Sequence, residues 1–208
     1  PALERYRWYL HNIRRRRAHV LTPAEEKLLA AAGEMANAPD TIYGMFSDAD
    51  VTFPDAIDSE GNHHPLSQGT YISYMESPDR VLRKSAFENL YRTYGSYKNT
   101  ISAILAAQVK QLQFFADARK YSSAMEASLD VTNVPTEVYT NLIEAVHKNM
   151  DKMYRYVALR KKLLGVDELH MYDIYTPLVE DVAKKATIDE AKQTVYDALA
   201  PLGEDYRK

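Results

Sequence analysis

One run of apolar side chains constrains the fold of this chain more than any other feature. Apolar residues recur in it every three or four positions: Leu82, Ala86, Leu90, Tyr94, Tyr97, Ile101, Leu105, Val109 and Leu112. That spacing aligns side chains on one face of an α-helix, whereas a strand would need alternation by two. The sequence therefore predicts a helix from Ser77-Pro78 to about Phe115, with Gly95 marking a kink or a close contact with another helix.

Helix start and stop signals predict further helices on both sides of this run. Thr22–Glu25 and Thr187–Glu190 have the spacing of a capping box, in which the first turn of a helix satisfies its own free amides. Another long helix is expected to begin at Pro135 and to end at Gly165. We therefore predict a mostly α fold of long amphipathic helices, forming a single helical segment over residues 1–208.

The signal for β structure is confined to one short region. Residues 58–62 read Asp-Ser-Glu-Gly-Asn, which is strong turn chemistry, and Pro54 and Pro65 flank them at positions compatible with edge strands. This pattern predicts one small β-hairpin near 51–66, an insert over about 50–68. Such a hairpin is marginally stable alone and is expected to pack against helices.

Composition excludes several classes of protein. The formal net charge of −3 does not favour a nucleic-acid partner, and no apolar run approaches the ~20 residues of a membrane-spanning helix. The absence of cysteine excludes disulfides and thiolate metal ligands, and it fits a cytoplasmic location. Four consecutive arginines, Arg14–Arg17, end the first expected helix, where cations interact favourably with the helix dipole. Contact with an anionic peptide is the alternative interpretation.

The segment Leu159–Leu178 contains the candidate site. Its helix is expected to end at Gly165, and acidic, aromatic and histidine residues follow up to a proline. Binding residues often lie in such connections. The candidate binding residues are His170, Tyr172, Asp173 and Tyr175. The alternative, which stays open, is a buried connection whose polar groups are hydrogen-bonded internally.

Three stretches together resemble a known family of peptidases. These are Leu159–Leu178, Arg119–Ala127 and the tripeptide Asn133-Val134-Pro135. They resemble oligoendopeptidase F, a bacterial branch of the thimet-oligopeptidase-like zinc metallopeptidases. The resemblance extends to the opening helix, Leu3–Leu21, and to Ala49–Pro54. It implies a helical shell around a deep channel, in which a zinc-bound water hydrolyses short peptides. The four candidate residues, His170, Tyr172, Asp173 and Tyr175, would then line this substrate channel.

The resemblance also implies a His-Glu-x-x-His motif, and this chain has none. That spacing places two zinc ligands on one helix face, with the glutamate as general base. No two of the six histidines are four positions apart: His11, His19, His63, His64, His147 and His170. We therefore expect a noncatalytic portion of a larger metalloendopeptidase, inactive alone, with neither catalytic nor metal-binding residues.

The same interpretation predicts the partners. Zinc and short peptide substrates are expected for the parent enzyme, and the remaining catalytic portion of the same polypeptide is expected to pack on this segment. Apolar faces left uncovered would let the chain self-associate, with candidates at Phe114-Phe115, Tyr91/Tyr94 and Ile174–Leu178. A nonenzymatic helical interaction module related to the same family is the alternative.

Overall fold

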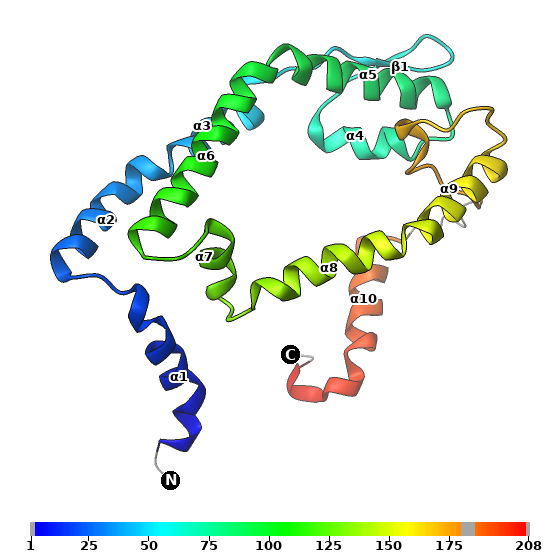
Figure 1. Cartoon of the computed structure of the whole chain (residues 1–208). Helices are drawn as coiled ribbons and strands as arrows, with labels where there is room; N and C mark the ends of the chain where they lie inside the picture. The colour runs from blue at the N-terminus through cyan, green and yellow to red at the C-terminus, as the bar shows by residue number, and fades with distance from the viewer. Residues whose placement is uncertain (1–2, 180–185, 207–208) are drawn as a thin grey trace. The chain divides into compact units, whose positions relative to one another are not determined.

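The computed structural model describes residues 3–179 and 186–206, and helices dominate these ranges (Figure 1). The chain divides into two compact units, Pro1–Thr176 and Pro177–Lys208. The helices of the first unit are α1 (Arg7–Arg16), α2 (Pro23–Ala36), α3 (Ala38–Met45), α4 (Gln68–Met75), α5 (Arg80–Ser96), α6 (Lys98–Ala118), α7 (Ala124–Asp130), α8 (Thr136–Lys148) and α9 (Met150–Leu164). The second unit contains α10 (Ile188–Ala198). The expectation of a mostly α fold is confirmed, whereas the single segment over 1–208 stays a prediction.

The helix signals in the sequence have the expected geometry. Thr22 caps α2, since its hydroxyl accepts the Glu25 amide at 3.4 Å and the Glu25 carboxylate accepts the Thr22 amide at 2.9 Å. In the second unit, Thr187 and Glu190 form the same capping box at the start of α10. α9 ends where Gly165 adopts a left-handed conformation with φ of 65°, which glycine tolerates without steric cost.

Both long helices that the periodicity predicts are interrupted. Tyr97 separates α5 from α6, with φ and ψ of −103° and 10°, and its amide bonds to the Tyr94 carbonyl three residues back at 3.0 Å. Asn149 separates α8 from α9 in the same conformation. The break therefore lies two residues beyond Gly95. Apart from the neighbouring backbone of α5, no described atom lies within 4 Å of a Cβ placed on Gly95. Of the two alternatives for Gly95, the close helix contact is therefore wrong, and the structure has an interruption nearby, at Tyr97.

The predicted hairpin is present and short. β1 (Ala56–Ile57) pairs antiparallel with β2 (His63–His64), so that Ala56 lies opposite His64. Asp58 closes the turn by accepting the Glu60 and Asn62 amides at 2.9 and 2.8 Å. The sequence interpretation missed α4, whose start is capped by a Ser67–Thr70 box.

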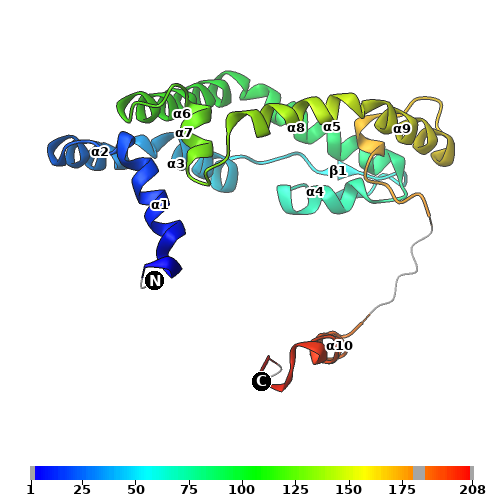
Figure 2. The ribbon, with the colours of Figure 1, turned by 60° about the horizontal axis from the view of Figure 1, so that its bottom comes forward.

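The core of the first unit forms where the hairpin, α4 and α5 meet, and Figure 2 shows β1 and α4 beside α5. The buried cluster consists of Ala56, Leu66, Met75, Leu82, Ala86, Leu90 and Tyr172. Tyr172 comes from a 3₁₀ turn, η4 (Met171–Asp173), which follows α9 and packs on α5. The connection after α9 is therefore part of the core. Within the described ranges, no helix combines the length and the apolar character that crossing a bilayer requires.

Candidate functional site

The four candidate residues divide into a buried pair and an exposed pair. Tyr172 and Asp173 are 7% and 0% exposed, whereas Tyr175 is 55% exposed and the His170 side chain 41%. An extended segment would have placed His170 and Tyr172 on one side. The 3₁₀ turn instead directs the consecutive residues Tyr172 and Asp173 into the core.

Asp173 is fully hydrogen-bonded by its surroundings. Arg80 donates from Nε to Oδ1 at 3.1 Å and from Nη2 to Oδ2 at 2.9 Å. Arg83 donates from Nη2 to Oδ1 at 2.9 Å, and the backbone amide of His170 donates to Oδ2 at 3.0 Å. Each carboxylate oxygen thus accepts two hydrogen bonds.

Two buried arginines also bind backbone carbonyls, in the connection after α9 and just before α5. Arg83 donates from Nε to the Tyr172 carbonyl at 3.0 Å, and from Nη1 to the Ser77 carbonyl at 2.7 Å. Arg160 of α9 donates from Nε to the Asp173 carbonyl at 2.9 Å and from Nη2 to the Thr176 carbonyl. We call Arg80, Arg83, Arg160 and Asp173 the arginine clamp. It fastens the connection after α9 onto α5.

The clamp keeps Asp173 ionised. Burial favours the neutral carboxyl, but hydrogen bonds from Arg80, from the His170 amide and from Arg83 outweigh it and lower the pKa of Asp173 to about 2. A general base works best with a pKa near the working pH, and its free oxygen must reach the substrate. Asp173 therefore serves as an anchor.

The outer surface of the clamp is polar and aromatic. The His170 ring stacks on Tyr172 with centroids 4.9 Å apart and planes inclined by 14°, and the Arg80 guanidinium lies 5.4 Å from the Tyr172 ring centroid. The Nε2 atom of His170 is 3.8 Å from a Glu168 carboxylate oxygen. This surface offers hydrogen-bond donors and an imidazole on a fixed support.

The arginines of the clamp were not among the candidate residues. Arg80 and Arg83 lie three positions apart on α5, about 90 residues before Asp173, and nothing in the sequence pairs them with it. The one available signal is that Arg83 lies next to Leu82 on the apolar face of a helix. An arginine there needs an internal partner, because a buried charge is costly when it is unpaired.

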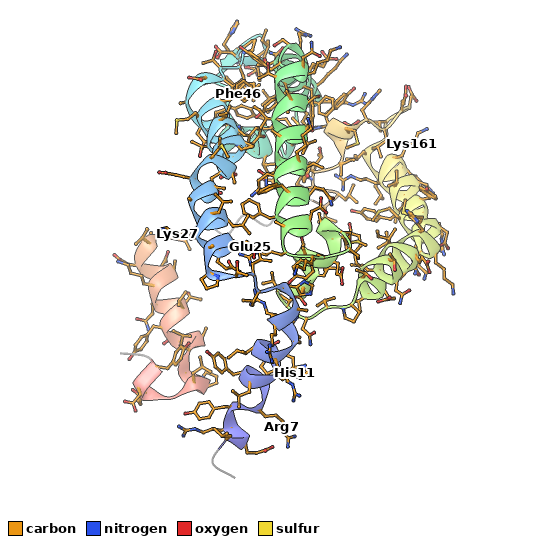
Figure 3. The ribbon with its side chains drawn as sticks, turned by 60° about the vertical axis from the view of Figure 1, so that its left-hand side comes forward. Arg7, His11, Glu25, Lys27, Phe46 and Lys161 are labelled. Carbon is orange, nitrogen blue, oxygen red and sulfur yellow. The ribbon has the colours of Figure 1, made fainter. Side chains whose placement is uncertain are left out.

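A second arginine–carboxylate contact fixes the N-terminal helix. Arg15 donates to the carboxylate and, at 2.6 Å, to the carbonyl of Asp130, which ends α7. The Tyr121 hydroxyl donates to the same carboxylate at 2.8 Å. Figure 3 shows α1, on which Arg7 and His11 are labelled, below this region. Arg15 therefore ties α1 to α7, a role that neither interpretation of Arg14–Arg17 included.

The described residues do not fit a zinc site. Catalytic zinc takes about three protein ligands and one open position for water. Over residues 3–179 and 186–206, no three His, Cys, Asp or Glu side chains come together in an arrangement that could hold a metal ion. No zinc chemistry can therefore be assigned to them.

Comparison with known proteins gives matches along almost the whole chain. The family model described as peptidase family M3 matches residues 73–200, and the model described as oligopeptidase F matches residues 1–53. Oligopeptidase PepF of Bacillus subtilis is 44% identical over 98% of this chain, and group B oligopeptidase PepB of Streptococcus agalactiae is 37% identical over 99%. The resemblance to oligoendopeptidase F is confirmed.

A solved structure has the same fold. The crystal structure of oligoendopeptidase-F from Enterococcus faecium superposes on all of this chain with a TM-score of 0.81 and 42% identity. The chain covers 39% of that structure, 30% of PepF and 34% of PepB. It thus spans about a third of the length of the relatives that it matches.

Proposed function

This chain belongs to peptidase family M3, and from that premise we propose that it forms the helical scaffold and part of the channel wall of an oligopeptidase. The observation that carries the proposal is the 44% identity to an oligopeptidase over 98% of the chain. The parent enzyme would hydrolyse short peptides in the cytoplasm.

The arginine clamp supports a scaffold role. Asp173 is 0% exposed, and its carboxylate is held by two arginines and a backbone amide. Breaking a buried pair of this kind strongly destabilises a fold, so the clamp fixes the position of its outer surface. A rigid support is what a binding surface needs, because misplaced contacts lose affinity and rate.

The exposed candidates would supply the channel wall. Of the four residues, His170 and Tyr175 have accessible side chains, whereas Tyr172 and Asp173 are buried and contact His170 through its ring and its backbone amide. A histidine and a tyrosine can donate and accept hydrogen bonds to peptide groups, and both present flat apolar faces. In this proposal His170 and Tyr175 contact substrate, and neither takes part in bond cleavage.

The catalytic metal would belong to another part of the longer enzyme. Zinc bound there would supply the activated water, and the described residues of this chain would position the walls around it.

The experiment that tests the proposal begins with the source gene. A reading frame that continues beyond Lys208 and encodes His-Glu-x-x-His is expected. The polypeptide that it encodes should cleave a quenched fluorescent peptide of about ten residues, and a chelator should abolish the cleavage. A stop codon directly after Lys208, or an inert longer polypeptide, would favour the interaction module instead.

A further inference from the structure

The helices α8 and α9 have an apolar surface that nothing in their unit covers. No residue of α8 is buried, and α9 has a buried residue only at Arg160, which belongs to the clamp. The exposed apolar side chains of α8 and α9 include Val138 (54%), Tyr139 (47%), Leu142 (62%), Ile143 (40%), Val146 (53%), Met153 (54%), Tyr154 (63%) and Val157 (38%). We call them the α8–α9 stripe. Figure 3 shows side chains standing out from these helices, with Lys161 labelled near the end of α9.

The spacing of the stripe matches one helix face. Val138, Leu142 and Val146 follow each other at intervals of four on α8, and Met153 and Val157 have the same spacing on α9. Residues three and four apart are neighbours on a helix, so these side chains form one strip along α8 and another along α9, on the two sides of the break. A strip of this kind is the pattern by which a helix packs against another helical layer.

The stripe is held in place at both ends. At the start, α8 contacts α7, and at the far end Arg160 and η4 attach the chain to α5. Helices of this length are marginally stable in water by themselves and are stabilised by packing of their apolar face. Between these two points, α8 and α9 lack such a covering layer within their unit. Exposed apolar patches of this extent are rare in monomers and mark interfaces.

The comparisons provide a candidate for the partner of the stripe. The same fold, with a TM-score of 0.81, occurs within a solved oligoendopeptidase that this chain covers to 39%. We propose that the α8–α9 stripe is the docking face for the remaining part of a longer polypeptide, which packs an apolar helical layer along it. This inference rests on the proposed function and adds the place where the catalytic portion meets the scaffold.

The chain lacks cysteine, so a single introduced cysteine reports its own exposure without background from this portion. Leu142→Cys places a thiol in the middle of the stripe. Glu144→Cys is the matched control, because two residues further along a helix turns the side chain by about 200°, onto the opposite face. Each variant is labelled with a thiol reagent in the 208-residue chain and in the longer polypeptide encoded by the source gene, and mass spectrometry of the labelled peptide gives the rate.

The expected result is that Leu142→Cys reacts at least about tenfold more slowly in the longer polypeptide, whereas Glu144→Cys reacts equally in both. Equal labelling rates of Leu142→Cys in the 208-residue chain and in the longer polypeptide would overturn the docking face, even if the longer polypeptide is an active peptidase. Protection in a longer polypeptide without peptidase activity would uphold the docking face and refute the proposed function. Protection in the 208-residue chain that grows with its concentration would mean that a second copy covers the stripe, and would overturn the proposal.

Discussion

Arg83 donates a hydrogen bond to Asp173 at 2.9 Å across 90 positions of sequence, and both side chains are almost completely buried. The same guanidinium also binds the carbonyls of Ser77, Pro78 and Tyr172. One side chain thus joins the start of α5 to the turn that follows α9. The backbone amide of His170 bonds to the same Asp173 carboxylate at 3.0 Å, so the clamp also positions His170.

Replacing Arg83 by methionine is predicted to lower the free energy of unfolding by about 3–5 kcal/mol, because the Asp173 charge then stays buried with one partner fewer. Urea denaturation measures the loss. Arg92→Met is the control, since Arg92 is an exposed residue of the same helix and should change stability by less than about 0.5 kcal/mol. Equal effects of the two substitutions would show that the clamp does not stabilise the fold.

The ionisation of Asp173 predicts a pH dependence of stability. Its pKa is about 2 in the folded chain against an ordinary 3.8, so its contribution is fully present above pH 4 and is lost as the pH falls towards 2. The shift corresponds to about 2 kcal/mol. Asp173→Asn should be less stable at neutral pH, and the gap between the two proteins should narrow below pH 4. A gap that stays constant from pH 6 to 2 would contradict the ionised clamp.

Asp130 is predicted to hold α1 on α7. Asp130→Ala removes the carboxylate that accepts from Arg15 and Tyr121 and leaves only the Arg15 bond to the Asp130 carbonyl; hydrogen bonds to a charged group contribute about 1.5–3 kcal/mol each. Amide hydrogen exchange over residues 7–16 should become faster, with little change in α5. Glu144→Ala, at an exposed position on α8, should leave the exchange of α1 unaltered. Unchanged protection of α1 in the Asp130 variant would show that other contacts hold it.

Tyr175 is predicted to contact peptide in the longer enzyme. Tyr175→Ala should raise KM for short peptides by about fivefold with kcat nearly constant, the signature of lost ground-state binding worth about 1 kcal/mol. Tyr9→Ala, at a tyrosine 64% exposed on α1, serves as the control. A fall in kcat without a change in KM would assign Tyr175 another role.

The helices could be predicted from the sequence wherever local chemistry decides them. The capping boxes at Thr22 and Thr187 and the left-handed Gly165 depend on residues a few positions apart. The breaks at Tyr97 and Asn149 were missed because the apolar spacing continues across them. At Asn149 the side chain donates to the Ala145 carbonyl at 2.7 Å and satisfies the end of α8, which periodicity does not reveal.

The clamp could not be predicted, because its residues lie far apart in the sequence. Asp173 was a candidate because it lies in a polar, aromatic connection, but its partners Arg80 and Arg83 are 93 and 90 positions away. Only the folded chain brings them together. The role of His170 and Tyr175 as channel residues stays a prediction. Of the apolar faces expected to be exposed, Ile174 and Phe114 are 39% and 54% exposed, whereas Tyr94 packs against the core and Thr176 is 6% exposed.

Zinc content gives a further check on the role of this chain. After dialysis against a weak chelator, the purified 208-residue chain is predicted to retain no stoichiometric zinc, because the described residues provide no set of three ligands. Elemental analysis measures the metal. One equivalent of tightly held zinc would reveal a site that the described residues do not account for.

The most direct test of the scaffold role compares peptide cleavage by two purified proteins at equal concentration with zinc added: the 208-residue chain and the longer polypeptide from the source gene. The longer polypeptide is predicted to cleave a short quenched fluorescent peptide in a chelator-sensitive reaction, and the 208-residue chain is predicted to leave it intact. Chelator-sensitive cleavage by the homogeneous 208-residue chain would contradict the account, because the chain would then contain the catalytic site itself.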